Sequence, residues 1–251
     1  MAPAEILLLV TVGFLAGTCN ALVGGGTLFT FPVLLAAGLP PVLANTTTTV
    51  ALVPGTLTSA YAYLPELGRL REHLPKRIVA ATAGGLLGAV LLLVSGNAVF
   101  FYLVPWLLGA ATALFTFSRR IVRRVTKDPH RKNETRLLGM EFVSAIYGGY
   151  FGAAIGILLL ASMALAGERD IQSANAQRNF LVCFINGVAA LIFIVTGSVA
   201  WNVALIVMAG AIGGGYFGAR VARRIPNEAL RVIITAAGAL FSVYYFVKAY
   251  G

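Results

Sequence analysis

The sequence predicts an all-α polytopic membrane protein. Hydrophobic residues make up 59% of its 251 residues and charged residues only 11%, whereas soluble domains carry about 25% charged residues. Several apolar runs are longer than the roughly 20 residues that a helix needs to cross the hydrocarbon core of a bilayer. A transmembrane barrel is excluded, because its strands would alternate in polarity within segments of about ten residues.

Eight hydrophobic segments follow one another, at residues 5–39, 42–67, 78–95, 98–118, 137–166, 171–196, 202–221 and 229–250. The first and the fifth are too long for one straight crossing of a core about 30 Å thick and barely long enough for two. Both contain clustered glycines, the first at Gly24, Gly25 and Gly26 and the fifth within 148–156. Because glycine costs a helix about 1 kcal/mol relative to alanine, we predict that both segments are broken and re-entrant. Close helix packing is the alternative role for these glycines.

The two halves of the chain share a repeat. Three motifs recur 130 residues later: Ala44-Asn45 as Ala174-Asn175, Gly84-Gly85-x-x-Gly88-Ala89 as Gly214-Gly215-x-x-Gly218-Ala219, and Asn97 as Asn227. One match would be weak because glycine is abundant, but three matches at one offset indicate an internal duplication. The predicted organisation is a first transmembrane repeat at 1–118, a basic linker at 119–136 and a second transmembrane repeat at 137–251.

The positions of the basic residues favour inverted repeats. If the first and fifth segments each enter and return, the loops at 69–77, 119–136, 167–170 and 220–231 lie on one side of the membrane. These loops hold 17 of the 19 lysines and arginines, and such an excess marks cytoplasmic loops. If each segment crossed once, the repeats would be parallel and basic loops would lie on both faces. We therefore predict a multi-pass protein with inverted repeats and both termini outside the cytoplasm, an architecture that recurs among secondary transporters.

Polar residues at and after each predicted break are the candidates for a binding site. They are Gly24, Gly25, Gly26, Asn45, Thr46, Thr47, Asn175, Gln177, Arg178 and Asn179. In an inverted fold the two clusters would meet near the midplane, where the N-termini of broken helices present free N–H groups and a positive dipole end. Asparagine, glutamine and threonine add neutral donors, and the guanidinium of Arg178 suits oxyanions. The pattern predicts a site for a small anion.

Each candidate also has a structural interpretation. Arg178 lies about seven residues into its segment, so its side chain could extend to the cytoplasmic interface. Asn45 and Asn175 could cap helices or join them by hydrogen bonds, and the threonines could bond carbonyls of their own helix. Tyr147 and Asn20 lie near the breaks as weaker candidates.

Other kinds of chemistry are not indicated. The carboxylates, Glu141 among them, lie near segment ends, so no proton-relay carboxylate is visible within the membrane. No nucleotide-binding motif, catalytic triad or metal motif is present, and we predict neither an enzyme nor a cofactor. Cys19 and Cys183 lie in apolar surroundings as small hydrophobes. The net charge of +10 belongs to short loops between apolar runs, so no nucleic-acid partner is predicted.

A longer motif surrounds the glycines of the first half. It comprises Gly13-x-x-x-Gly17, then Val23-Gly24-Gly25-Gly26-Thr27-Leu28 with Phe31-Pro32, and then Gly38-Leu39-Pro40-Pro41-x-x-Ala44-Asn45-Thr46-Thr47. This motif resembles the glycine-rich start of the sulfite exporter TauE/SafE family, and the resemblance extends over nearly the whole chain. The second half departs from it, because Gly152-Ala153-Ala154-Ile155-Gly156 stands in place of the family's usual glycine run.

The resemblance implies a permease of the bacterial plasma membrane for sulfur-containing anions such as sulfite, thiosulfate or organosulfonates. It also implies export, with the proton gradient as the coupling force and the lipid bilayer as the surroundings. With inverted repeats, transport would proceed by alternating access about a site between them. A permease for another small organic anion and an uncoupled anion channel are the alternatives.

Overall fold

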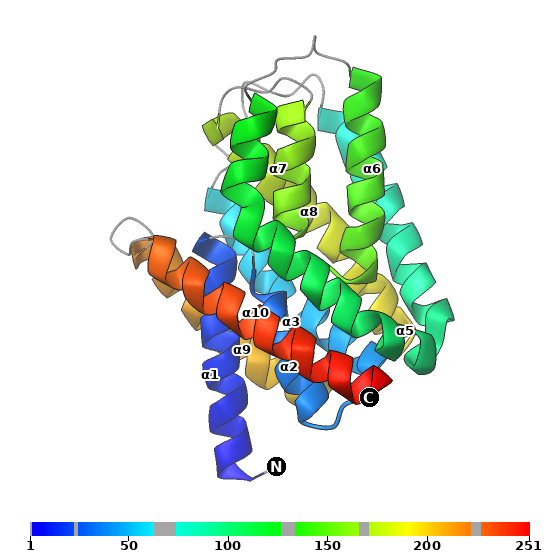
Figure 1. The fold of residues 1–251 in the computed structure, drawn as a ribbon, viewed down its shortest axis with the longest axis vertical. Coiled ribbons are helices and arrows are strands. Elements are labelled where there is room, and N and C mark those ends of the chain that lie inside the picture. The colour runs from blue at the N-terminus through cyan, green and yellow to red at the C-terminus, as the bar shows by residue number, and fades with distance from the viewer. Residues whose placement is uncertain (1, 23–24, 63–73, 127–133, 166–170, 222–226) are drawn as a thin grey trace.

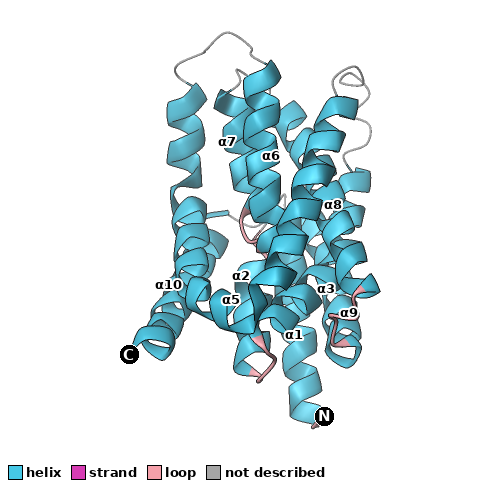
Figure 2. Ribbon diagram, turned by 90° about the vertical axis from the view of Figure 1, so that its right-hand side faces the viewer, coloured by secondary structure: helices cyan, strands magenta, loops and turns pink. Residues whose placement is uncertain are grey.

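The computed structural model describes residues 2–22, 25–62, 74–126, 134–165, 171–221 and 227–251, and within them every regular element is a helix. The helices are α1 (Pro3–Leu22), α2 (Thr27–Ala36), α3 (Pro41–Ala62), α5 (Leu74–Thr126), α6 (Glu134–Tyr150), α7 (Ile155–Leu165), α8 (Ile171–Val195), α9 (Trp201–Val221) and α10 (Asn227–Tyr250). Both termini lie toward one end of the molecule, which we call the terminal end (Figure 1 and Figure 2). Helix α6 begins toward the opposite end, which we call the α6 end.

The surface and the helix lengths are those of a helical membrane protein. Three described stretches are long and apolar enough to cross a bilayer: Pro3–Asn20, Leu74–Phe117 and Ala176–Val195. Large hydrophobic side chains such as Leu7 and Val195 are exposed along the helices. Exposed apolar surface over so many elements is expected where the surroundings are lipid. The prediction of an all-α membrane protein is therefore confirmed for the described residues.

Helix α5 is two helices joined at Gly96. Its backbone there has φ 68° and ψ 173°, a conformation that glycine adopts without the steric cost of a Cβ. At its far end α5 continues to Thr126, and α6 begins at Glu134. Residues 119–126 and 134–136 of the predicted linker are therefore helical, because arginine, lysine and glutamate are good helix formers even outside an apolar run.

Both predicted breaks are present. Helix α1 ends at Leu22 and α2 begins at Thr27, whereas α6 ends at Tyr150 and α7 begins at Ile155. Helices α2 and α7 have 10 and 11 residues, about half the length that crosses a bilayer. From the breaks, α2 lies toward the terminal end and α7 toward the α6 end (Figure 1).

The second break forms without consecutive glycines at its turn. Gly152 and Ala154 have φ values of 77° and 60°, and the left-handed conformation is uncommon for alanine. The amides of Phe151 and Gly152 both donate to the carbonyl of Tyr147, at 2.9 and 3.3 Å. Sharing this carbonyl closes the last turn of α6 before the chain reverses into α7.

Rows of glycines bring helices of the two halves into close contact. An added Cβ on Gly13 of α1 would collide with the carbonyl of Val207 on α9, and one on Gly214 of α9 would collide with α1 in return. Likewise, a Cβ on Gly88 of α5 would collide with the carbonyl of Ile146 on α6. Small residues let helix backbones approach in this way within membranes. The glycines that repeat in the sequence therefore form packing surfaces between the two halves.

A buried ion pair joins α5 to α6. The Nε of Arg77 donates to both carboxylate oxygens of Glu141, at 3.0 and 2.9 Å, and the Nη2 of Arg77 also bonds Glu141. Arg77 is 5% exposed and Glu141 is fully buried. The sequence placed Arg77 in a cytoplasmic loop and Glu141 near a segment end. The structure corrects the loop for Arg77, which lies in the first turn of α5, and it shows that Glu141 is buried because α6 begins at Glu134, before the hydrophobic segment.

Removing one partner of this pair should destabilise the protein. Glu141→Leu leaves the Arg77 guanidinium buried without its counter-charge, which costs roughly 3–5 kcal/mol. Arg77→Met combined with Glu141→Leu removes both charges and should recover most of this loss. Reversible unfolding in detergent mixtures measures the free energy of unfolding of each variant.

The control is the exposed pair between Lys76 and Glu134, whose Nζ and Oε1 lie 3.0 Å apart. Breaking it with Lys76→Ala should change the free energy of unfolding by less than about 1 kcal/mol. A double variant as unstable as Glu141→Leu would contradict the explanation that the unpaired buried charge causes the loss of stability. It would indicate that lost side-chain packing causes it instead.

Candidate functional site

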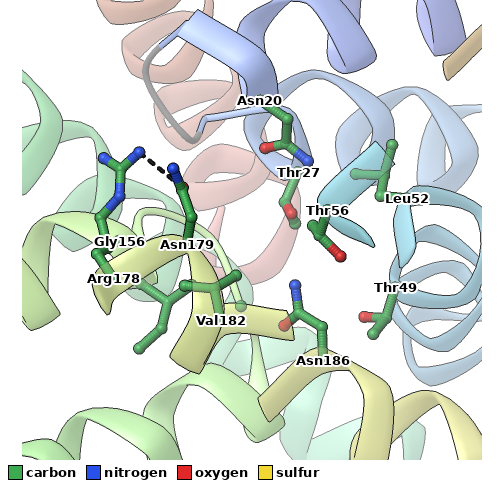
Figure 3. A pocket seen from close by; sticks show the side chains of 12 residues that line it. Asn20, Thr27, Thr49, Leu52, Thr56, Gly156, Arg178, Asn179, Val182 and Asn186 are labelled. Carbon is green, nitrogen blue, oxygen red and sulfur yellow. Dashed lines mark hydrogen bonds between the residues drawn. The ribbon is translucent and has the colours of Figure 1, made fainter. Parts of the chain in front are cut away.

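A cavity of about 40 Å³ lies where the two breaks meet α3 and α8. By the measure that one water needs roughly 10–15 Å³, it has room for about three water molecules. The lining residues, shown in Figure 3, are Asn20, Thr27, Thr49, Leu52, Thr56, Gly152, Ile155, Gly156, Arg178, Asn179, Val182 and Asn186. Polar side chains from four separate segments thus surround one small space in the middle of an apolar protein.

Helices α3 and α8 contribute matching positions to the cavity. Thr49, Leu52 and Thr56 lie at intervals of three and four residues on α3, a spacing that puts them on one face of the helix. Adding 130 to their numbers gives Asn179, Val182 and Asn186 on α8, and these also line the cavity. The offset found in the sequence therefore relates the two long walls of the cavity, residue by residue.

The N-termini of both short helices lie at the cavity. Thr27 is the first residue of α2 and Ile155 is the first residue of α7, and both are lining residues. The N-terminus of a helix carries a partial positive charge, which favours an anion. One such terminus comes from each half of the chain, and both favour an anion.

Hydrogen bonds engage the amide oxygens of two of the lining asparagines. The Oδ1 of Asn20 accepts from the backbone N–H of Gly26 at 3.0 Å. The Oδ1 of Asn179 accepts from Nη2 of Arg178 at 2.9 Å. The Oδ1 of Asn186 is buried with no hydrogen-bond partner among the described residues, and its amide nitrogen points toward Thr56 (Figure 3). With their oxygens engaged, Asn20 and Asn179 have their amide nitrogens left as donors.

Arg178 supplies the charge of the site. Its side chain lies over Gly156, where an added Cβ would come 3.1 Å from Cδ and 3.6 Å from Nη1. Arg178 is only 9% exposed, so its side chain is held within the protein. Of the described residues that line the cavity, Arg178 alone is charged. A partly buried cation that faces neutral donors suits an anion with several acceptor oxygens.

The predicted polar cluster of the first half is hydrogen-bonded outside the cavity. The Nδ2 of Asn45 donates to the carbonyl of Tyr150, the last residue of α6, at 3.0 Å. The hydroxyl of Thr46 donates to the carbonyl of Ser198, and the hydroxyl of Thr47 accepts from the amide of Ala200 at 3.0 Å. These bonds join α3 to the end of α6 and to the turn before α9.

The remaining predicted residues are divided among three situations. Arg178 and Asn179 line the cavity, whereas Gln177 is 3% exposed and its Nε2 donates to Ser173 at 2.9 Å. Gly25 and Gly26 form the turn before α2, and an added Cβ on Gly26 would press against α1 at Ala16 and Asn20. Gly24 and the side chain of Asn175 lie outside the described residues.

Several lining residues were not among the candidates chosen from the sequence. They are Thr27, Thr49, Thr56, Gly152, Gly156 and Asn186, with Asn20 chosen only as a weaker candidate. A signal for some of them was available. Asn186 lies seven residues beyond Asn179, two helical turns along the same face. The offset of 130 then leads from Asn186 to Thr56 and from Asn179 to Thr49.

The fold and the cavity together define a class of protein. A helical membrane protein with discontinuous helices that meet at a polar central cavity has the general form of a membrane transporter. The comparison with known families agrees: the chain belongs to the sulfite exporter TauE/SafE family, which matches residues 9–245.

Curated relatives carry transporter names. The chain is 28% identical to the "Probable membrane transporter protein" of Haemophilus influenzae, over 91% of this chain and 89% of that protein. It is 30% identical to the "Probable membrane transporter protein ORF9" of a Sinorhizobium species, over 85% and 82% of the two chains. It is 24% identical to YfcA of Escherichia coli K12, named a "Probable membrane transporter protein", over 100% and 93%. No solved structure matches the chain.

Gly156→Ala should weaken the binding of a small oxyanion by displacing Arg178. The added methyl group would lie 3.1 Å from Cδ of Arg178, closer than ordinary van der Waals contact, so the guanidinium must move. We expect affinity for sulfite to fall about tenfold, which corresponds to about 1.4 kcal/mol. Isothermal titration of the purified protein in detergent measures this change.

The matched control is Gly187→Ala on the same helix as Arg178. A Cβ at Gly187 would meet no atom within 4 Å, so affinity should be unchanged. Equal affinity of the Gly156→Ala variant and the parent protein would show that the position of Arg178 over Gly156 does not matter for binding.

Proposed function

We propose that the protein is a secondary transporter that exports small sulfur-containing anions across the plasma membrane by alternating access. The observation that carries the proposal is a central cavity lined by the cation Arg178, by asparagine amides and by the first residues of two helices. Arg178, the amide nitrogens of Asn20, Asn179 and Asn186 and the N-termini of α2 and α7 all favour negative charge. Among the described lining residues there is no carboxylate to oppose an anion.

The size and chemistry of the cavity favour a compact oxyanion. Sulfite and thiosulfate carry several acceptor oxygens on one centre, and a sulfonate head group presents the same arrangement. A guanidinium bonds such a group through two parallel N–H donors, while the side-chain amides offer donors to the remaining oxygens. The family description names sulfite, which fits a cavity of about 40 Å³.

The same proposal includes inverted repeats at 1–118 and 137–251. Its support is the exchange of contacts between the halves, with α1 against α9 and α6 against α5. The short helices α2 and α7 extend from the cavity toward opposite ends of the molecule (Figure 1). Two halves related in this way can exchange conformations, which opens a central site first to one side and then to the other.

Arg178→Gln should abolish anion transport. The substitution keeps a polar side chain but removes the charge and the forked donors that pair with an oxyanion. In proteoliposomes, radiolabelled sulfite and thiosulfate should show saturable flux with the parent protein that responds to an imposed pH gradient. We expect the flux of Arg178→Gln to fall about 100-fold or more, given that charge-assisted bonds contribute roughly twice as much as neutral ones.

Lys76→Gln, a change at an exposed lysine outside the cavity, is the control and should leave flux unchanged. A variant Arg178→Gln with parental affinity would overturn the role of Arg178. Ohmic conductance in place of saturable flux would indicate an anion channel, and transport of small carboxylates alone would indicate a different organic anion.

The inverted arrangement predicts the sidedness of the basic stretches. In a background without Cys19 and Cys183, single cysteines placed within 69–77, 119–136 and 220–231 should all react with an impermeant thiol reagent from the cytoplasmic side. Positive charge marks this side. Labelling of the first and last of these stretches from opposite faces would require parallel repeats instead.

A further inference from the structure

A second cavity lies at the other end of α2. It has a volume of about 490 Å³ and is lined by residues that include Leu35, Gly38, Asn97, Phe101 and Lys248. We call it the terminal-end cavity, because α2 extends from the central cavity toward the end that holds both termini (Figure 1). Thr27 of α2 lines the central cavity and Leu35 lines the terminal-end cavity. Eight residues of helix, about 12 Å, separate the two.

Three buried phenylalanines pack together close in sequence to residues that line the two cavities. Phe31 comes from α2, Phe100 from α5 and Phe151 from the turn between α6 and α7, and their exposed fractions are 0%, 0% and 1%. The ring centroid of Phe31 lies 5.9 Å from that of Phe100 and 5.3 Å from that of Phe151, and the rings meet edge to face. The centroids of Phe100 and Phe151 are 6.3 Å apart. The three rings therefore form one closed cluster, with the geometry that aromatic pairs prefer.

Sequence neighbours show that the cluster lies between the cavities. Thr27, Phe31 and Leu35 follow one another at intervals of four residues, so they share one face of α2. The first of them lines the central cavity and the last lines the terminal-end cavity. Phe151 directly precedes Gly152 of the central cavity, and Phe100 directly precedes Phe101 of the terminal-end cavity.

The cluster has no aromatic counterpart in the other half of the repeat. Phe100 corresponds to Leu230 by the offset of 130. Across the two breaks the helix ends are offset by 128, so Phe31 and Phe151 correspond to Leu159 and Val23. The three rings are therefore particular to one half of the repeat.

We propose that Phe31, Phe100 and Phe151 form the gate that separates the anion site from the terminal-end cavity, and that this gate is closed in the conformation described. The proposal deepens the proposed transport function, on which it rests. A hydrophobic constriction excludes water, and an anion that cannot keep its hydration shell does not cross it. Passage requires α2 to carry Phe31 away from the other two rings.

Contacts of α10 indicate how α2 would be moved. The hydroxyl of Tyr245 donates to the carbonyl of Pro32, next to Phe31, at 2.9 Å. Lys248 of the same helix lines the terminal-end cavity, where its positive charge faces the space that an anion would enter. Helix α10 thus links the charged wall of this cavity to the backbone beside the gate.

Accessibility of a cysteine in the central cavity tests the gate without any need for transport. The protein carries Cys19→Ala, Cys183→Ala and Thr49→Cys, is reconstituted in liposomes, and receives a sulfonate-bearing methanethiosulfonate reagent from one side at a time. With the gate intact, Cys modification should proceed from the α6 side and not from the terminal side. With Phe31→Ala added, modification from the terminal side should accelerate about tenfold or more as the constriction widens.

Two further variants keep the result interpretable. Phe193→Ala removes an equally buried phenylalanine of α8 outside the cluster and should leave terminal-side modification slow. Phe31→Leu retains an apolar side chain of intermediate size and should give an intermediate rate if Phe31→Ala fails to fold. A Thr49→Cys protein that reacts equally from the terminal side with and without the rings would overturn the gate.

The outcomes for the gate and for the transport function are separable. Thiol modification reports on access alone, whereas sulfite titration with Arg178→Gln reports on the site. A closed gate with no anion binding would refute the anion site and leave the barrier standing. Anion binding that depends on Arg178, combined with free terminal-side access in the parent, would refute the gate and leave the site standing.

Discussion

Within hydrocarbon, every backbone N–H and C=O group needs a partner inside the protein, because each unsatisfied group costs several kcal/mol. This constraint governs the two helix breaks, on which the rest of the structure depends. At the first break, the side chain of Asn20 accepts the N–H of Gly26. At the second, Asn45 donates to the carbonyl of Tyr150, while the carbonyl of Tyr147 accepts two amides. Asn20 and Asn45, which the sequence suggested as binding-site residues, therefore satisfy backbone groups at the two breaks.

Close packing between the halves brings the two breaks together. The glycines of α1 and α9, and those of α5 and α6, remove the side chains that would hold these backbones apart. Gly26 has the same function at short range, since a Cβ there would press on Ala16. The breaks therefore lie at one central cavity, where the N-termini of α2 and α7 meet the polar faces of α3 and α8. Of the two roles considered for Gly24, Gly25 and Gly26, the structure shows close packing at Gly26, whereas neither Gly25 nor Gly26 is among the residues that line the cavity.

The sequence predicted the helix breaks of this fold but only part of the candidate site. Segment length and clustered glycines predicted the breaks, and Arg178 and Asn179 were found because charge and amide groups are rare in apolar runs. Thr56 and Asn186 were missed because a single polar residue within a long apolar segment has no local signal. Thr46 and Thr47 bond the turn before α9, a contact between distant segments that no local pattern contains. Glu141 seemed peripheral because the helix begins before the hydrophobic run does.

At some matching positions of the two halves, a charged residue in one half corresponds to an uncharged residue in the other. Arg178 corresponds to Thr48 by the offset of 130, and Thr48 is fully buried with no hydrogen-bond partner among the described residues. The ion pair of Arg77 and Glu141 corresponds to Val207 and Gly13, because α6 follows α1 at an offset of 128, and these two residues cannot form an ion pair. Under the proposed alternating access, a repeated backbone would provide two equivalent arrangements, but equal energies would require equal side chains. A charge on one wall of the cavity and a buried ion pair in one interface would then make the two arrangements unequal. On that proposal, the differences between the halves, more than their likeness, decide which arrangement the protein favours when the site is empty.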